Sequence, residues 1–357
     1  MADFTITLSY KKAAAKVHMI EGWKPPAGGR IDDLLPPRGI TACRAAIGSL
    51  QFLASQGMGL IAADTSILAS YCNEGTYGLV TKLNKTIRTA HECSAIPNVF
   101  RPLNDPIFVT FHDAAWAVRK DGKSQAGFIL GMTERRILDG EKAPVSPLMQ
   151  VSKKCPRVTR SSLGCEIQSA SMADEETLFL RLAYTEAMHG KVDLRDLATT
   201  LKLTTATLVT DCKGLYDTLT KNVSAGLGAD DRRSGIEALA LRQSMALSKC
   251  TMRWLHSEAQ PADGLTKGSN TARALLADFL TRGYWKLTAD VTFTSAKKRR
   301  AEGRLDILDD GVVRQPYLPE APADDEGDFW CDVNFADSEN EYDGFGDLPV
   351  YIMKLTI

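Results

Sequence analysis

The order of strand-like and helical segments between residues 107 and 283 constrains the fold of this chain most. Three consecutive apolar segments have the composition of β-strands and are separated by short turns. They lie at 107–118, 125–134 and 146–160, and are followed by a helix at 163–190, a strand at 205–211, helices from 213 and around 235–247, a strand at 250–258 and a helix at 270–283. This order predicts an α/β domain at 105–287, with a mixed five-stranded sheet and flanking helices.

The chain upstream of this domain has a different pattern. Residues 24–39 are rich in Pro and Gly, so residues 1–39 are expected to form an irregular N-terminal segment. Between 40 and 97, apolar side chains such as Leu79 and Leu83 recur at helical spacing. A small helical module is therefore predicted in front of the α/β domain.

Charge is distributed unevenly along the chain. The formal net charge is −1, so no overall field marks the protein as a nucleic-acid binder. Residues 288–357 are expected to be a disordered tail, first basic and then acidic, because eleven Asp and Glu and no Lys or Arg lie between Pro316 and Leu348. The basic run Lys297, Lys298, Arg299 and Arg300 is either a nuclear localisation signal or a nucleic-acid contact.

Cysteine usage and hydropathy bear on the compartment. The eight cysteines are scattered, with no CxxC pair and no spacing typical of a zinc site. No apolar run approaches the ~18 residues of a membrane span, and the N-terminus lacks the apolar core of a signal peptide. We expect an intracellular protein, cytoplasmic or nuclear, with no membrane partner.

Four acidic side chains occupy similar places in the predicted elements. Asp113 lies within an apolar strand, where an isolated carboxylate is costly to desolvate. Glu166 lies in the first turns of the long helix, Asp211 ends the fourth strand, and Asp263 begins a helix. Strand ends and helix starts can converge on one edge of a sheet, where divalent cations would neutralise the carboxylates. Taken singly, such an aspartate is more often a turn or cap residue.

Five motifs carry a resemblance to a known family. In chain order they are HDAAWAVRKDGKSQAGFILGM, SKKCPRVTRSSLGCE, ETLFLRL, TDCKGLYD and HSEAQPADGLTKG, all within residues 107–268. Together they resemble the ribonuclease H domain of copia-type retrotransposon Pol polyproteins. CRAAIGSLQFLAS, in the helical module, resembles the connection that follows the reverse transcriptase of those polyproteins. The paired aspartates of a polymerase palm have no counterpart, since Asp32 and Asp33 lie in a Pro/Gly loop, and no polymerase activity is expected.

The resemblance implies a fold, a reaction and a set of ligands. The fold would be ribonuclease H-like, and the reaction would be endonucleolytic hydrolysis of the RNA strand of an RNA/DNA hybrid, with a reverse transcriptase domain on another chain as a further partner. Asp113, Glu166, Asp211 and Asp263 would be catalytic and would bind two Mg²⁺ ions, for which Mn²⁺ can substitute. The sequence departs from the family at Leu163-Gly164 and at Cys212-Lys213, neither of which is a metal ligand.

Other side chains are candidates with open alternatives. His256 either assists catalysis by proton transfer or product release, or is a structural histidine at a strand end. His112 is expected to pack, Trp116 to lie in the core rather than to stack on a nucleotide, and Asp217 to be a surface residue and the substitute if Asp211 is wrong. A basic stretch next to Glu166 is predicted to contact nucleic-acid phosphates; it comprises Lys153, Lys154, Arg157 and Arg160.

Two other functions stay open at this point. An inactive copy could keep the fold and bind nucleic acid or a partner chain. A DNA nuclease of the same fold is the second alternative. Two motifs favour the retroelement interpretation over both alternatives. They are QPADGLTKG and the SKK that is followed by SS in SKKCPRVTRSS.

Overall fold

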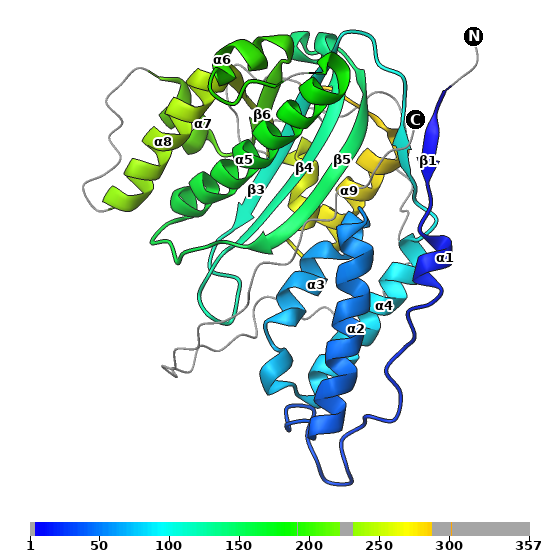
Figure 1. Ribbon diagram of the computed structural model, residues 1–357. Coiled ribbons are helices and arrows are strands. Elements are labelled where there is room, and N and C mark those ends of the chain that lie inside the picture. The colour runs from blue at the N-terminus through cyan, green and yellow to red at the C-terminus, as the bar shows by residue number, and fades with distance from the viewer. Residues whose placement is uncertain (1–3, 191, 222–230, 288–300, 302–357) are drawn as a thin grey trace. The chain divides into compact units, whose positions relative to one another are not determined.

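The computed structural model describes residues 4–190, 192–221, 231–287 and 301, and these are shown in colour in Figure 1. They all belong to one structural unit of the chain. The predicted disordered tail lies outside the described residues except for Ala301. No helix in the described part of the chain is both long enough and apolar enough to cross a membrane.

A mixed six-stranded sheet organises the α/β part. Its strand order is β7-β6-β3-β4-β5-β8. The bounds are β3 Pro106–Ala115, β4 Gln125–Glu134, β5 Ala143–Lys154, β6 Ala206–Thr210, β7 Cys250–Trp254 and β8 Tyr284–Trp285. β3, β4, β5 and β8 pair antiparallel, whereas β3, β6 and β7 pair parallel. The mixed sheet agrees with the sequence prediction, but the five-strand count is wrong, because a two-residue strand such as β8 carries too little pattern to be recognised.

Helices cover both faces of this sheet (Figure 1). They are α5 Ser162–His189, α6 Leu197–Thr200, α7 Lys213–Thr220, α8 Arg232–Ser248 and α9 Asn270–Arg282, with the 3₁₀ turns η3 Arg135–Asp139, η4 Leu201–Leu203, η5 Ser257–Ala259 and η6 Pro261–Leu265. Thr110 of β3 hydrogen-bonds Thr177 of α5 at 2.7 Å. The next residue, Phe111, packs edge-on against Phe279 of α9 with ring centroids 5.5 Å apart. Successive residues of β3 therefore face opposite layers of helix.

The main core lies between the sheet and α5, α7 and α8. Phe108, Phe128 and Leu208 come from three neighbouring strands and are at most 2% exposed. They pack against Ile167 and Ala170 on the buried face of α5. The small side chain at position 170 lets α5 lie close to the sheet, which positions the first turns of the helix beside the ends of β3 and β6.

The upstream part of the chain is mainly helical, as predicted. It contains β1 Ile6–Leu8, α1 Lys11–Ala14, α2 Pro37–Ser55, η1 Gly59–Ile61, α3 Ala62–Ala69, η2 Cys72–Glu74, α4 Tyr77–Cys93 and β2 Asn98–Phe100. β1 and α1 fall within the segment expected to be irregular. β1 pairs antiparallel with β2, so the N-terminal segment is tied to the stretch between the helical module and the α/β domain.

Buried polar contacts join these helices to the sheet. Arg119, which follows β3, donates hydrogen bonds to Ser66 of α3 and is 5% exposed. Arg273 of α9 forms a 2.7 Å ion pair with Asp64 of α3. Gln150 of β5 donates to the carbonyl oxygen of Gly57 at 2.8 Å. These contacts hold the helical module directly against the α/β part.

Candidate functional site

Three carboxylates converge where β3, α5 and β6 meet. Asp113, Glu166 and Asp211 each offer an oxygen that lies within 4.8 Å of the other two. Parallel pairing sets Phe111 beside Val209, so Asp113 and Asp211, each two residues further on, reach the same level of the sheet. The structure therefore brings together three of the four predicted acids.

Two hydrogen bonds fix the approach of α5 to this point. Ser161 caps the helix by accepting from the backbone N–H of Gly164 at 3.2 Å. One turn beyond Glu166, Ser169 donates its hydroxyl to the backbone oxygen of Asp113 at 2.8 Å. The helix is thus attached to β3 at Asp113 itself, and Glu166 is carried to the strand end.

Burial dominates the electrostatics of Glu166 and Asp211. Asp113 is 2% exposed and Glu166 is 8% exposed. Burial, followed by the charges of Asp113 and Asp211, raises the pKa of Glu166 well above its usual range. Burial and the charge of Asp113 raise the pKa of Asp211 to about 7. Glu166 Oε2 has no hydrogen-bond partner among the described residues, so an oxygen ligand atom is available in a buried site.

Asp263, the fourth predicted acid, is not a member of this group of three. It lies on η6. Lys267, one helical turn further on, connects it to the group of three acids. The ammonium Nζ of Lys267 lies 2.9 Å from Asp263 Oδ1 and 3.4 Å from Asp113 Oδ2. Burial and the charge of Asp113 raise the pKa of Asp263 to about 8. Sequence reasoning missed Lys267, although its i, i+4 spacing from Asp263 in QPADGLTKG signals the ion pair.

A glycine makes room for the turn that carries Lys267. Gly127 of β4 is the cross-strand partner of Asp113. A Cβ at position 127 would lie 2.7 Å from Leu265 Cβ and from Thr266 Cγ2, which is closer than such atoms approach. Because this side chain is missing, Thr266 can donate its hydroxyl to Asp113 Oδ2. The same turn thus presents a hydroxyl and an ammonium to one oxygen of Asp113.

His256 is not a member of the carboxylate group. It follows β7, is 1% exposed, and its Nδ1 accepts from the backbone N–H of Glu258 at 3.3 Å. Its ring packs edge-on against Trp254, whose Nε1 donates to the backbone oxygen of Asp211 at 3.0 Å. These contacts favour the structural alternative for His256.

The remaining single candidates differ in outcome. His112 is fully buried with no hydrogen-bond partner for its ring nitrogens among the described residues, and burial lowers its pKa to about 4, as expected of a packing role. Asp217 of α7 is ion-paired with Lys221 at 3.0 Å and is not a member of the acid group. The core prediction for Trp116 is wrong: its side chain is 49% exposed, because its indole donates to the backbone oxygen of Thr159 instead of entering the core.

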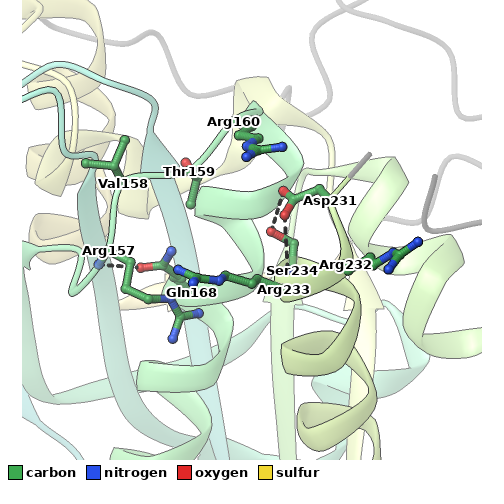
Figure 2. A pocket seen from close by; sticks show the side chains of 9 residues that line it. All are labelled: Arg157, Val158, Thr159, Arg160, Gln168, Asp231, Arg232, Arg233 and Ser234. Atoms are coloured by element: carbon green, nitrogen blue, oxygen red, sulfur yellow. Dashed lines mark hydrogen bonds between the residues drawn. The ribbon is translucent and has the colours of Figure 1, made fainter. Parts of the chain in front are cut away.

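The predicted basic stretch divides into two parts. Lys153 and Lys154 end β5 and face acidic side chains, Glu176 at 3.7 Å and Asp121 at 3.4 Å. Arg157 and Arg160 lie in the loop before α5 and line a pocket of about 500 Å³ (Figure 2). Arg232 and Arg233, in the first turn of α8, line the same pocket. Sequence reasoning missed these two because nothing local relates them to the loop before α5.

The pocket is built where the N-termini of α5 and α8 meet. A Cβ at Gly164 would lie 2.8 Å from Ser234 Oγ and 3.2 Å from Asp231 Oδ2, so the glycine permits this close approach. Asp231 caps α8 and is held by Ser234, as the dashed lines in Figure 2 show. Thr159 Oγ1 is buried and has no hydrogen-bond partner among the described residues. Four arginines outnumber the acidic neighbours, Asp231 and the Glu237 that pairs with Arg157, so the pocket attracts anions.

Comparison of the chain with protein-family models, with curated proteins and with solved structures found no match. The resemblance to copia-type ribonuclease H therefore rests on the five motifs alone. Its consequences for fold family and activity stay predictions.

Proposed function

We propose that this protein is a ribonuclease H-like nuclease that hydrolyses the RNA strand of an RNA/DNA hybrid with the help of Mg²⁺. The observation that carries the proposal is the group formed by Asp113, Glu166 and Asp211, whose oxygens lie within 4.8 Å of one another. Asp113 and Glu166 are buried and Asp211 is partly buried, and gathering three carboxylates so closely is unfavourable unless a cation offsets their charge. A site with this cost is better explained by function than by stability.

The donor set fits a hard divalent cation. All three side chains offer carboxylate oxygen, which Mg²⁺ and Mn²⁺ prefer, and no soft sulfur or imidazole ligand belongs to the group. The unpartnered Oε2 of Glu166 supplies a free coordination position. A bound ion would lower the pKa of a coordinated water and offset charge on a phosphate.

The chain's own residues then account for substrate binding. The arginine-lined pocket has the size and charge to hold a backbone phosphate, with the free hydroxyl of Thr159 as a further donor. The carbonyl oxygen of Thr159 also accepts from the exposed Trp116 indole, so the indole is attached to the loop that lines the pocket. Phosphate contacts of this kind give little base specificity, and selection of a hybrid would depend on 2′-hydroxyls of one strand.

In the proposed reaction, a water oxygen bonds to phosphorus and the P–O3′ bond breaks. The 3′ oxygen leaves with a proton, and the water oxygen remains on the new 5′ phosphate. The reaction would take place beside the metal ion that Asp113, Glu166 and Asp211 would hold. We assign no proton transfer to His256, because it is buried and its Nδ1 is already engaged.

The test is cleavage of a hybrid with a labelled RNA strand by the parent chain and by Asp113→Asn. We expect Mg²⁺-dependent cleavage by the parent, abolished by EDTA, and a rate at least about 100-fold lower in the variant, since even residues that only support metal ligands are worth 10–100-fold. Asp217→Asn is the matched control, because Asp217 is an ion-paired carboxylate outside the group. Equal cleavage by Asp113→Asn and parent would refute the assignment.

The two alternatives give different results in the same assay. An inactive binding protein would bind the hybrid in a gel-shift experiment without cleaving it at any Mg²⁺ or Mn²⁺ concentration. A DNA nuclease would cleave duplex or branched DNA in preference to the hybrid.

A further inference from the structure

Lys267 occupies the space between two carboxylates that come from different elements. Its Nζ lies 3.4 Å from Asp113 Oδ2 on β3 and 2.9 Å from Asp263 Oδ1 on η6. The Asp113 oxygen also accepts the hydroxyl of Thr266. One side of the Asp113 carboxylate is therefore engaged by donors of the chain itself.

The four acids thus form two groups that share Asp113. On one side are Glu166 and Asp211, within 4.8 Å of Asp113 and with the unpartnered Oε2 of Glu166. On the other side is Asp263, which reaches Asp113 through Lys267. In the described part of the chain, no positively charged side chain lies between the oxygens of the first group. Those oxygens are therefore open to a divalent ion.

We propose that Lys267 takes the place of a second divalent cation, so that this centre binds one divalent ion at Asp113, Glu166 and Asp211 while the ammonium neutralises the side between Asp113 and Asp263. The proposal deepens the proposed function and rests on its metal site, but it does not depend on hybrid cleavage. It replaces the two-ion expectation that follows from the family resemblance.

Two carboxylates hold the Lys267 ammonium in position. The Nζ atom lies within ion-pair distance of both Asp113 and Asp263, and the side chain as a whole is 41% exposed. A second divalent ion between Asp113 and Asp263 would have to displace the ammonium or lie next to it against like-charge repulsion.

The experiment is a titration of metal-free protein with Mn²⁺, without nucleic acid, followed by calorimetry and electron paramagnetic resonance. For the parent we expect one tightly bound Mn²⁺ per chain and the spectrum of an isolated ion. For Lys267→Met we expect a second bound Mn²⁺ and the spectrum of a spin-coupled pair, because both ions then share Asp113. A coupled spectrum is not produced by ions scattered over surface acids.

Two further variants serve as controls. Lys267→Arg keeps the positive charge and should keep the single-ion spectrum. Lys221→Met removes a lysine that is also paired with an aspartate four residues earlier, Asp217 at 3.0 Å, and should behave as the parent. Melting curves of the metal-free proteins should show a lower Tm for Lys267→Met than for Lys221→Met, because only the first leaves buried carboxylates without a counter-charge.

The outcomes separate the two proposals. A spin-coupled Mn²⁺ pair in the parent, or a single ion in Lys267→Met, would refute the role of Lys267 and leave the metal site intact. A parent that binds no Mn²⁺ would refute the metal site as well. Cleavage of a hybrid is measured separately and does not enter this decision.

Discussion

Replacing Asp211 by asparagine should show how far the close carboxylates lower the free energy of unfolding of the metal-free protein. In the folded chain, burial and the charge of Asp113 raise the pKa of Asp211 to about 7, against about 3.9 in an unfolded chain. Below about pH 4 the group is protonated in both states and has no effect on stability. As the pH rises, the unfolded chain releases this proton while the folded chain keeps it, and the folded state loses relative stability.

The size of the effect follows from the displacement of the pKa. Each pH unit between the two values costs the folded state about 1.4 kcal/mol, and the total approaches about 4 kcal/mol once the pH exceeds about 7. Above that value Asp211 is ionised in both states, so the penalty is complete and no longer changes. Asp211→Asn carries no titrating proton and escapes the penalty at every pH.

The assay is urea unfolding of parent and Asp211→Asn in EDTA at pH 5, 6, 7 and 8. We expect the variant to be the more stable protein, with a difference in unfolding free energy that widens by about 1.4 kcal/mol per pH unit from pH 5 to 7 and then stays level. Titrating groups that do not interact with Asp211 are common to both proteins and cancel, whereas Glu166, whose pKa the charge of Asp211 raises, adds to the pH dependence in the same direction. Adding Mg²⁺ should stabilise the parent selectively and narrow the difference.

A difference that does not depend on pH would refute this reasoning. So would a parent that is more stable than Asp211→Asn throughout. Either result would mean that Asp211 is already ionised in the metal-free fold and that Lys267 offsets its charge without any divalent cation.

Two further predictions concern the glycines and the arginine pocket. Gly127→Ala should lower the free energy of unfolding by about 1–3 kcal/mol and weaken Mn²⁺ binding, because the added Cβ would lie 2.7 Å from atoms of the turn that carries Lys267. The control is Gly48→Ala. Gly48 lies in a helix with nothing within 4 Å of the added Cβ, so this substitution should be stabilising. Arg160→Gln combined with Arg232→Gln should weaken hybrid binding and reduce the salt dependence of log K by about 1 for each phosphate that is no longer neutralised, whereas an unchanged salt dependence would exclude the pocket from the interface.

Much of the secondary structure is determined by local sequence. The second strand has the bounds that its pattern predicts, 125–134, and the long helix begins one residue before its predicted start. Both have a clear apolar period and end signals, a Ser cap for the helix and turn residues for the strand. Where prediction and structure differ, a local backbone constraint is responsible. The first strand ends at Ala115 because Ala117 has a positive φ of 53°, and the third ends at Lys154, two residues before Pro156.

The composition of the site was decided only by the tertiary structure. Sequence places Asp113, Glu166 and Asp211 at strand and helix ends, but their approach to within 4.8 Å depends on the parallel register of β3 and β6 and on the packing of α5. Sequence groups Asp263 with them, and the structure puts Lys267 in between. Local pattern fixes a residue's own backbone and the face it occupies. Which charges from distant segments meet depends on how closely those segments pack, which here is allowed by the absence of a side chain at Gly127 beside one site and at Gly164 beside the other.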